Sequence, residues 1–122
     1  EESLTQNKNS VQASVRNFLM DLNFRPNLCG YRYLMDIFPL LLQNPGQLMS
    51  KELYPTVGKL YNGSWQQIER GIRLSIKDAW KNREGEGWAL YFPHQKEKPS
   101  NSAFLARGIA YLQALFNEDG KA

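Results

Sequence analysis

Residues 61–83 read YNGSWQQIERGIRLSIKDAWKNR, a stretch that predicts a tight turn followed by a long helix. Asn62 and Gly63 both tolerate a positive φ, which favours a turn at this point. Ser64 is a preferred N-cap residue, and Gln67 three positions later completes the pattern of a capping box. A short helix is expected before the turn, so the whole arrangement predicts a helix-turn-helix.

Two chemically distinct faces are expected on the helix that follows Ser64. At about 100° per residue, its apolar side chains gather within roughly 40° of Trp65 or just beyond, which predicts a buried face. This face consists of Trp65, Ile68, Ile72, Ile76 and Ala79. A separate stripe, roughly 80° to 160° from Trp65, consists of Gln66, Arg70, Arg73, Lys77 and Lys81. Such a stripe is either an ordinary solvated face or a binding surface for a polyanion.

Positive charge is concentrated in this same stretch. Between Ser64 and Arg83 there are five basic residues and two acidic ones, so the local surplus of three equals the net charge of +3 for the whole chain. The ends of the chain are acidic instead, with Glu1, Glu2, Glu118 and Asp119. Charge gathered on one element indicates a polyanionic partner more strongly than total charge does.

Length and composition indicate one ordinary folded domain. The chain has 122 residues, of which 42% are hydrophobic and 22% charged, values close to those of globular proteins. No apolar run approaches the roughly 18 to 20 residues that span a bilayer, and the first residues do not resemble a signal peptide. The single cysteine cannot form an internal disulfide, which fits a cytoplasmic setting.

Candidates for catalysis or metal binding are weak. Cys29 and His94 are the only residues of their types, so the chain cannot assemble a zinc site from cysteines and histidines. We expect Cys29 to pack as a small apolar residue and His94 to lie in a loop. No carboxylate pair is spaced for hydrolysis. We therefore expect no enzymatic activity, no cofactor and no metal.

The pattern along the chain predicts an all-α fold, a single compact domain of five or six helices. Residues 1–9 are polar and are expected to be a linker or a disordered end, and residues 10–117 form the expected domain. Helices are predicted over about 10–24, 31–42, 50–61 and 64–83, with Pro39 expected to kink or end the second. A last helix, capped by Ser100 or Asn101, is predicted to contain Phe104 to Leu115. In the third, Leu53, Val57 and Leu60 are expected to face inward, and Gly58 to permit a close helix crossing. Residues 84–100 are expected to be mostly irregular.

Three segments resemble the C-terminal effector domain of the stage-zero sporulation protein A family, the sporulation response regulators of endospore-forming bacteria. They are GYRYLMD (30–36), LYPTVGKLYNGSWQQIERGIRLSIKDAW (53–80) and KPSNSAFLA (98–106). The resemblance extends from about Val15 to Leu115. It implies an all-helical domain whose helix-turn-helix binds a short DNA element at promoters. It also implies an N-terminal receiver domain in full-length members, whose phosphorylation promotes dimerisation.

Position by position, the family's DNA-reading residues correspond to Gln67, Glu69, Arg70, Arg73 and Leu74. Glu69, Arg70 and Arg73 keep the family's residue types, whereas Gln67 replaces an arginine and Leu74 a histidine. Arginine binds guanine bidentately through O6 and N7, while glutamine suits the N6/N7 edge of adenine. Leu74 cannot donate a hydrogen bond. Glu69 either accepts a hydrogen bond from cytosine N4 or orders a neighbouring arginine.

Further candidates for DNA contact are polar or basic residues near the turn and near the last helix. They are Ser64, Gln66, Lys77, Lys59 and Lys98, with Lys96 and Asn101 as weaker ones. For the lysines outside the fourth helix and for the residues at helix starts, ordinary surface or capping roles are equally consistent with the pattern.

The sequence thus predicts a DNA-binding transcriptional regulator domain, acting on sporulation-type genes through the major groove. Duplex DNA at promoter sites is the expected partner, with RNA polymerase or a sigma factor as a further candidate. The isolated chain is expected to be monomeric and to pair only on adjacent DNA sites. The alternative is a protein-interaction module whose basic helix face binds an acidic protein.

Overall fold

The computed structural model describes residues 2–49 and 51–121, and within them every regular element is a helix. The elements are α1 (Glu2–Asp21), α2 (Cys29–Gln43), the 3-10 helix η1 (Pro45–Met49), α3 (Leu53–Leu60), α4 (Trp65–Lys81), α5 (Gly87–Tyr91) and α6 (Asn101–Lys121). The all-α class predicted from the sequence is confirmed.

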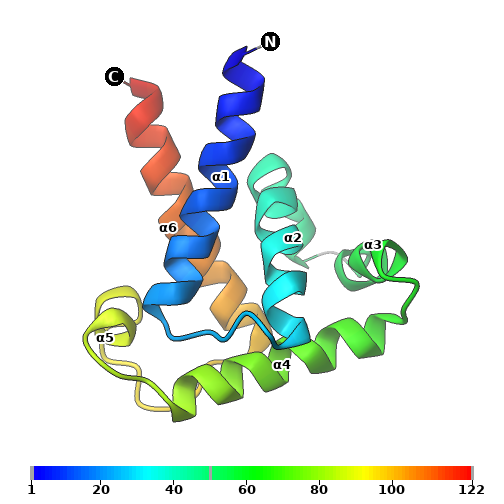
Figure 1. The fold of residues 1–122 in the computed structure, drawn as a ribbon, viewed down its shortest axis with the longest axis vertical. Helices are drawn as coiled ribbons and strands as arrows, with labels where there is room; N and C mark the ends of the chain where they lie inside the picture. The colour runs from blue at the N-terminus through cyan, green and yellow to red at the C-terminus, as the bar shows by residue number, and fades with distance from the viewer. Residues whose placement is uncertain (1, 50, 122) are drawn as a thin grey trace.

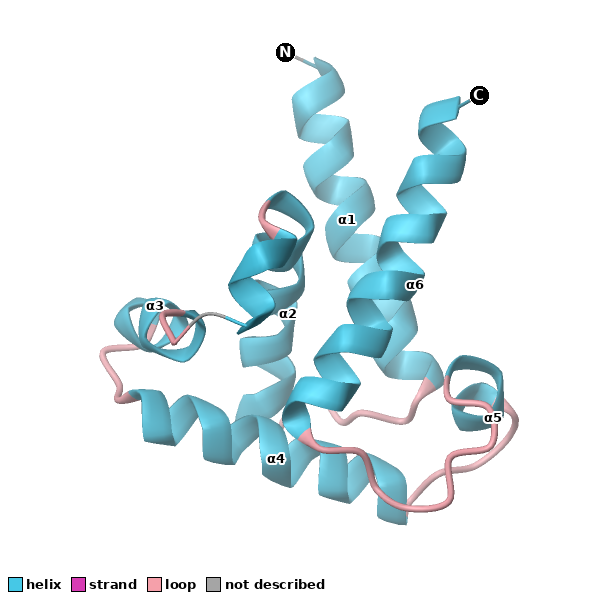
Figure 2. Ribbon diagram, turned by 180° about the vertical axis from the view of Figure 1, so that it is seen from behind, coloured by secondary structure: helices cyan, strands magenta, loops and turns pink. Residues whose placement is uncertain are grey.

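Three helices stand side by side on a fourth. Figures 1 and 2 show α1, α2 and α6 running roughly parallel or antiparallel, with α4 lying across one end of the group. The short helices α3 and α5 lie near the two ends of α4. Because α2 and α3 both pack extensively against α4, the helix with the basic stripe is held from its inner side and leaves its opposite side outward.

The core is built from aromatic and aliphatic side chains that these helices share. Phe18, Phe38 and Phe104 come from α1, α2 and α6 and are almost completely buried, with ring centroids about 6 Å apart. Four residues of α4 complete the core, namely Ile68, Ile72, Ile76 and Ala79. Burying such large side chains is the main favourable contribution to folding, so the apolar face predicted for α4 fixes the orientation of that helix.

Two residues predicted to be buried are exposed. Trp65 is 50% exposed and Leu60 is 65% exposed, so both predictions are wrong. Leu60 is the last residue of α3, and Trp65 is the first residue of α4. Periodicity assigns a face to a residue but does not tell whether another helix reaches that far along the axis. Both side chains lie where the helices adjoin the turn.

The boundaries differ from the sequence prediction in several places. α1 begins at Glu2 rather than Ser10, so its first turns lie in the segment expected to be a linker or disordered end. The domain limits 10–117 stay a prediction. α2 begins at Cys29 and continues past Pro39 to Gln43. In the segment expected to be irregular, α5 forms a short helix whose Trp88 is buried and donates a hydrogen bond from Nε1 to the Leu22 carbonyl at 2.9 Å.

Candidate nucleic-acid interface

The turn between α3 and α4 has the geometry that the sequence predicts. Asn62 has a φ of 52°, and the Gly63 N–H donates to the Gly58 carbonyl at 2.9 Å. Ser64 Oγ accepts a hydrogen bond from the Gln67 N–H at 3.2 Å, which confirms Ser64 as the N-cap of α4. The second helix of the helix-turn-helix is therefore capped, and a main-chain hydrogen bond holds the turn in place.

Close packing at this turn explains the glycine in α3. A Cβ atom on Gly58 would lie 2.7 Å from the Gly63 carbonyl oxygen, which is shorter than van der Waals contact. Gly58 is thus required because the turn folds back over α3. The close helix crossing that the sequence predicts at Gly58 is not the reason for the glycine. The Gln67 amide also departs from the capping-box pattern, since it donates to Tyr33 Oη at 3.3 Å.

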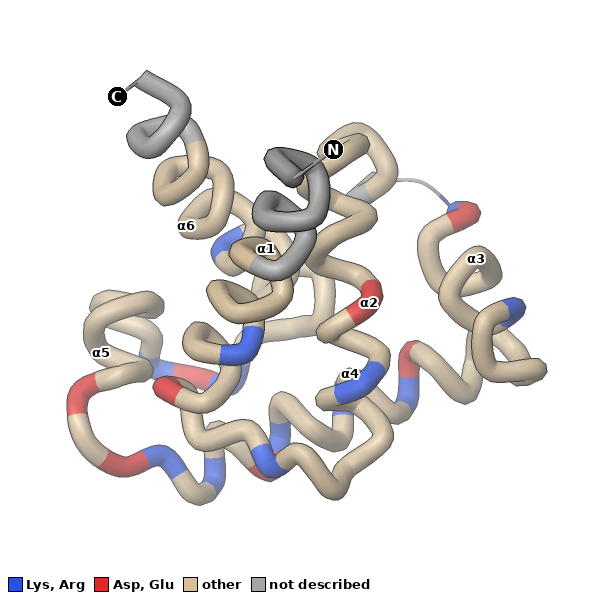
Figure 3. The backbone as a smooth tube through the Cα atoms, turned by 45° about the horizontal axis from the view of Figure 1, so that its top comes forward, with Lys and Arg blue, Asp and Glu red and all other residues tan. Residues whose placement is uncertain are grey.

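The outward face of α4 is basic, as predicted. All five residues of the predicted stripe are exposed, namely Gln66, Arg70, Arg73, Lys77 and Lys81. Figure 3 shows basic residues recurring along α4. Among the described residues, Arg70, Lys77 and Lys81 make no ion pair. By contrast, Arg83 stacks on Trp80, with Cζ 3.9 Å from the ring centroid. Three uncompensated charges therefore remain for a partner.

A hollow of about 540 Å³ adjoins one flank of this face. On one side it is lined by Ser64, the N-cap of α4, and by Gln66, Gln67, Arg70 and Leu74 of α4. On the other side it is lined by Leu28, the N-cap of α2, and by Cys29 and Gly30 of α2. The hollow thus brings five of the predicted site residues together. Cys29 is exposed at its rim, so the prediction that Cys29 packs as a small apolar residue is wrong. As the first residue of α2 it precedes the buried part of that helix.

Two glycines set the floor of the hollow. A Cβ atom on Gly30 would lie 2.3 Å from the Gly71 carbonyl oxygen and 2.2 Å from Ser75 Oγ. A Cβ atom on Gly71 would lie 2.6 Å from the Tyr33 ring. Because neither position has a side chain, the start of α2 approaches the backbone of α4 closely. This contact fixes the first half of α4 relative to the rest of the domain.

The opposite flank of α4 has a polar network. Arg73 Nε donates to Glu69 Oε2 at 3.2 Å. Asn101, the first residue of α6, donates from Nδ2 to the Glu69 carbonyl at 3.0 Å and to Glu69 Oε2 at 3.5 Å. Ser100 Oγ caps α6 by accepting from the Ala103 N–H at 3.2 Å. In this structure Glu69 thus pairs with a neighbouring arginine, and a contact with cytosine stays a prediction.

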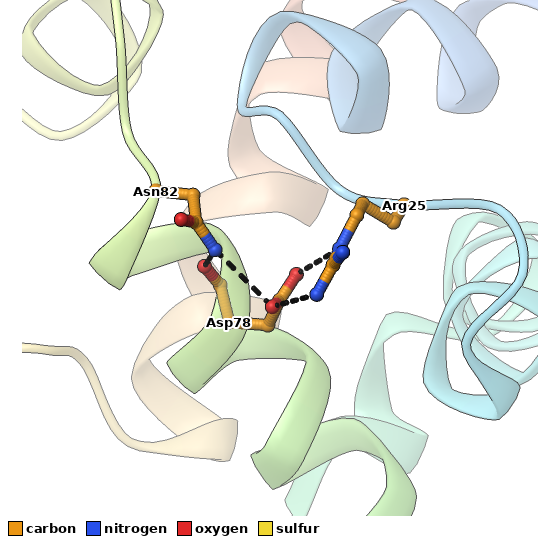
Figure 4. A network of polar contacts seen from close by, with 3 residues as sticks. All are labelled: Arg25, Asp78 and Asn82. Carbon is orange, nitrogen blue, oxygen red and sulfur yellow. Dashed lines mark hydrogen bonds and ion pairs between the residues drawn. The ribbon is translucent and has the colours of Figure 1, made fainter.

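A second polar network holds the C-terminal end of α4, and it was not predicted from the sequence. Figure 4 shows Arg25 bound bidentately to Asp78, from Nε at 2.9 Å and from Nη2 at 2.5 Å. Asn82 Nδ2 donates to the Asp78 carbonyl at 2.9 Å and to Oδ1 at 3.2 Å. The hydrogen bond and the charge of Asp78 raise the pKa of Arg25. Arg25 thus offsets a negative charge that would otherwise oppose a polyanion beside α4.

The remaining candidates lie away from the hollow. Lys59 is exposed on α3, one residue before its end, and Lys98 is exposed in the loop before α6. His94 lies in the same loop with a φ of 66°. In the described part of the chain, no three His, Cys, Asp or Glu side chains are arranged to hold a metal ion. Nor does any helix there combine the length and apolarity that crossing a membrane requires.

The two helices, the locked turn and the outward basic face define a helix-turn-helix domain of the kind that binds DNA. The family model described as "Sporulation initiation factor Spo0A C terminal" matches residues 15–112, which is most of the chain. The protein belongs to this family, and the resemblance found in the sequence is confirmed. It is a sporulation-related DNA-binding effector domain, and membership implies a receiver domain in a full-length member.

Proposed function

We propose that this domain binds duplex DNA in a sequence-specific manner and regulates sporulation-type genes from promoter sites. The observation that supports this proposal is the outward face of α4, where Arg70, Lys77 and Lys81 are exposed and have no ion-pair partner among the described residues. A helix about 10–12 Å across fits the major groove, where base edges are distinguishable.

The first half of α4 reads bases in this proposal, and the second half contacts the backbone. A recognition helix enters the groove with its N-terminal residues leading. Arg70 and Arg73 are the expected guanine readers, through paired bonds to O6 and N7. Gln66 is the amide on this face best placed for adenine, because the Gln67 amide already donates to Tyr33. Lys77, nearly three turns after Gln67, then lies where phosphates pass.

Residues outside this face have positioning roles. Ser64 at the start of α4 suits a phosphate contact through the exposed N–H groups of the first turn. Lys59 is exposed near the end of α3 and Lys98 in the loop before α6, and we propose phosphate contacts for both. Leu74 replaces the hydrogen-bonding histidine of the family and lines the hollow beside Arg70, so we assign it an apolar contact.

We further propose that the free domain is a cytoplasmic monomer that pairs only on adjacent DNA sites, with RNA polymerase or a sigma factor as the protein partner at the promoter. The membership of a response-regulator family supports this view. Sedimentation of the isolated domain would contradict it by showing a tight dimer without DNA.

One binding experiment tests the proposed function. Duplexes selected from a random pool are titrated with the domain at several salt concentrations, beside a scrambled duplex. We expect log K to fall with log salt at a slope of about −0.9 for each phosphate contacted. Lys77→Ala should weaken both duplexes alike and reduce the slope by about one. Arg70→Ala should cost about 1–3 kcal/mol on the selected duplex and relax specificity there.

The same experiment separates the alternatives. Duplex binding without salt dependence would contradict an interface built on phosphates. Binding to an acidic protein with no binding to duplex would instead support the protein-interaction module. If Arg70→Ala weakened both duplexes to the same extent, Arg70 would position the domain and not read a base.

A further inference from the structure

Asn101 joins α6 to α4 at one point beside the basic face of α4. It is the first residue of α6, and its side-chain amide donates to the main-chain carbonyl of Glu69 at 3.0 Å and to Glu69 Oε2 at 3.5 Å. One amide therefore holds the start of α6 against α4.

The Glu69 carboxylate is held from two sides. Its Oε2 atom accepts from Arg73 Nε at 3.2 Å on one side and faces Asn101 Nδ2 on the other. Half-burial of Glu69 strengthens these interactions relative to those of a fully exposed pair. An i,i+4 ion pair on an open helix surface contributes only about 0.3–0.5 kcal/mol and leaves both side chains mobile. Asn101 supplies the second anchor that an isolated pair lacks.

The consequence for Arg73 is a defined orientation. Its side chain is 49% exposed, and Glu69 engages Nε. The two terminal nitrogens, Nη1 and Nη2, therefore remain available as a forked pair of donors. Such a pair matches the O6 and N7 acceptors of guanine in the major groove. An arginine already held in its binding rotamer loses less conformational entropy when it binds.

We propose that Asn101 is a positioning residue for sequence reading: it fixes the Glu69 carboxylate, and Glu69 in turn presents the terminal nitrogens of Arg73 to a guanine. This inference rests on the proposed function of α4. It gives α6, which lies outside the helix-turn-helix, a part in base discrimination. It also assigns Glu69 the role of orienting Arg73 and not of accepting from cytosine.

The test is a double-mutant cycle on base discrimination. The affinity ratio between the selected and the scrambled duplex is measured for the wild-type domain, Asn101→Ala, Arg73→Ala and the double variant. Arg73→Ala should lower the ratio by about 5- to 150-fold, the value of one bidentate base contact. Asn101→Ala should lower it by about threefold or more, as is typical of coupled residues. In the Arg73→Ala background, Asn101→Ala should lower the ratio no further.

A modified base gives a readout that a purely structural role would not change. Replacing the contacted guanine by 7-deazaguanine removes N7, the acceptor that one Arg73 nitrogen requires. The wild-type domain should distinguish the two duplexes, and both Asn101→Ala and Arg73→Ala should lose most of that difference. Ser102→Ala is the matched control, since Ser102 is exposed on the next position of α6, and it should behave as the wild type does.

The possible failures are distinguishable. Equal loss of affinity on both duplexes, or a loss that adds to that of Arg73→Ala, would show that Asn101 only stabilises the packing of α6 and would overturn the inference. If thermal unfolding measurements show that Asn101→Ala is not folded, Glu69→Gln tests the same relay. An unchanged affinity ratio between the two duplexes in that variant would overturn the inference. A wild-type domain that binds no duplex selectively would overturn the proposed function itself.

Discussion

Leu74 is an aliphatic side chain in an otherwise basic surrounding. It is 44% exposed, and it lines the hollow together with Arg70 and Cys29. The bases expose one apolar group in the major groove, the 5-methyl group of thymine. If α4 binds in the major groove as proposed, we expect Leu74 to favour thymine at one position of the site, where the histidine of the family would instead donate a hydrogen bond.

This preference is testable with a single methyl group. Replacing the relevant thymine of the selected duplex by uracil removes the methyl and should weaken binding by about fourfold, the effect of roughly 0.8 kcal/mol for one buried carbon. Leu74→Ala should bind the thymine and uracil duplexes almost equally. Isothermal titration of both proteins with both duplexes measures the coupling, and a thymine preference that persists in Leu74→Ala would refute the contact.

Periodicity predicted the exposure of most residues on α4, but not of its first residue, and it could not predict contacts between residues distant in sequence. Arg70 and Lys77 are exposed because their angular positions place them opposite the apolar face. Arg25 could not have been assigned to Asp78, because the two residues lie 53 positions apart and no local pattern links them. The Asn101–Glu69 contact was missed for the same reason. Trp65 was placed in the core although it precedes the covered part of its helix.

At the level of elements, Gly58 decides whether the turn can close. Alanine in a helix is normally favoured over glycine by about 0.8–1.0 kcal/mol. At this position the added Cβ would lie 2.7 Å from the Gly63 carbonyl oxygen. Because this oxygen belongs to the main chain, it cannot rotate away as a side-chain atom can. We expect Gly58→Ala to destabilise the domain by about 1–3 kcal/mol and to weaken duplex binding, because the start of α4 shifts.

Gly46→Ala is the matched comparison for this prediction. A Cβ atom on Gly46 would meet its nearest neighbour, Asn44 Oδ1, at 3.4 Å, an ordinary contact. Chemical denaturation should place Gly46→Ala within about 0.5 kcal/mol of the wild type, as for most surface changes. A Gly58→Ala variant as stable as Gly46→Ala would show that the turn has room that the structure does not indicate.

The elements predicted most reliably were long and periodic. α4 and α6 have clear N-caps and a repeated apolar spacing, and both were located from sequence. α5 was missed because a helix of five residues contains too few turns to show a period. Its position depends instead on Trp88, whose indole donates to the end of α1. Such long-range contacts override local propensity, and composition alone does not reveal them.

For the molecule as a whole, two tyrosines join the short helices α3 and α5 to the longer helices α2 and α1. Tyr61 at the end of α3 donates to Asp36 of α2, and Tyr91 of α5 donates to Asp21 of α1 at 2.8 Å. Burial, followed by the hydrogen bond to a carboxylate, raises the pKa of both hydroxyls. The folded state therefore retains two protons at a pH where the unfolded chain, with tyrosine pKa values of about 10, has lost them.

The sign of the pH dependence follows from this difference. The stabilisation contributed by the two protonated tyrosine hydroxyls is fully present below about pH 10, the pKa of tyrosine in the unfolded chain. It decreases as the pH rises from there towards the pKa of these hydroxyls in the folded state. We expect urea unfolding to show a falling free energy of unfolding above about pH 10. In Tyr61→Phe/Tyr91→Phe the fall should be shallower, although the variant is less stable at neutral pH. Parallel curves for both proteins would contradict the assignment.

The position of Cys29 gives the native chain a chemical reporter of its own. Its thiol is the only one in the sequence, and it is exposed at the rim of the hollow beside Arg70 and Leu74. Alkylation by a small maleimide should therefore proceed readily in the free domain and slow markedly when a selected duplex covers that rim. A scrambled duplex at the same concentration should protect less. The rate of thiol modification thus records occupancy of α4 without any substitution in the protein, and an unchanged rate would show that DNA lies elsewhere.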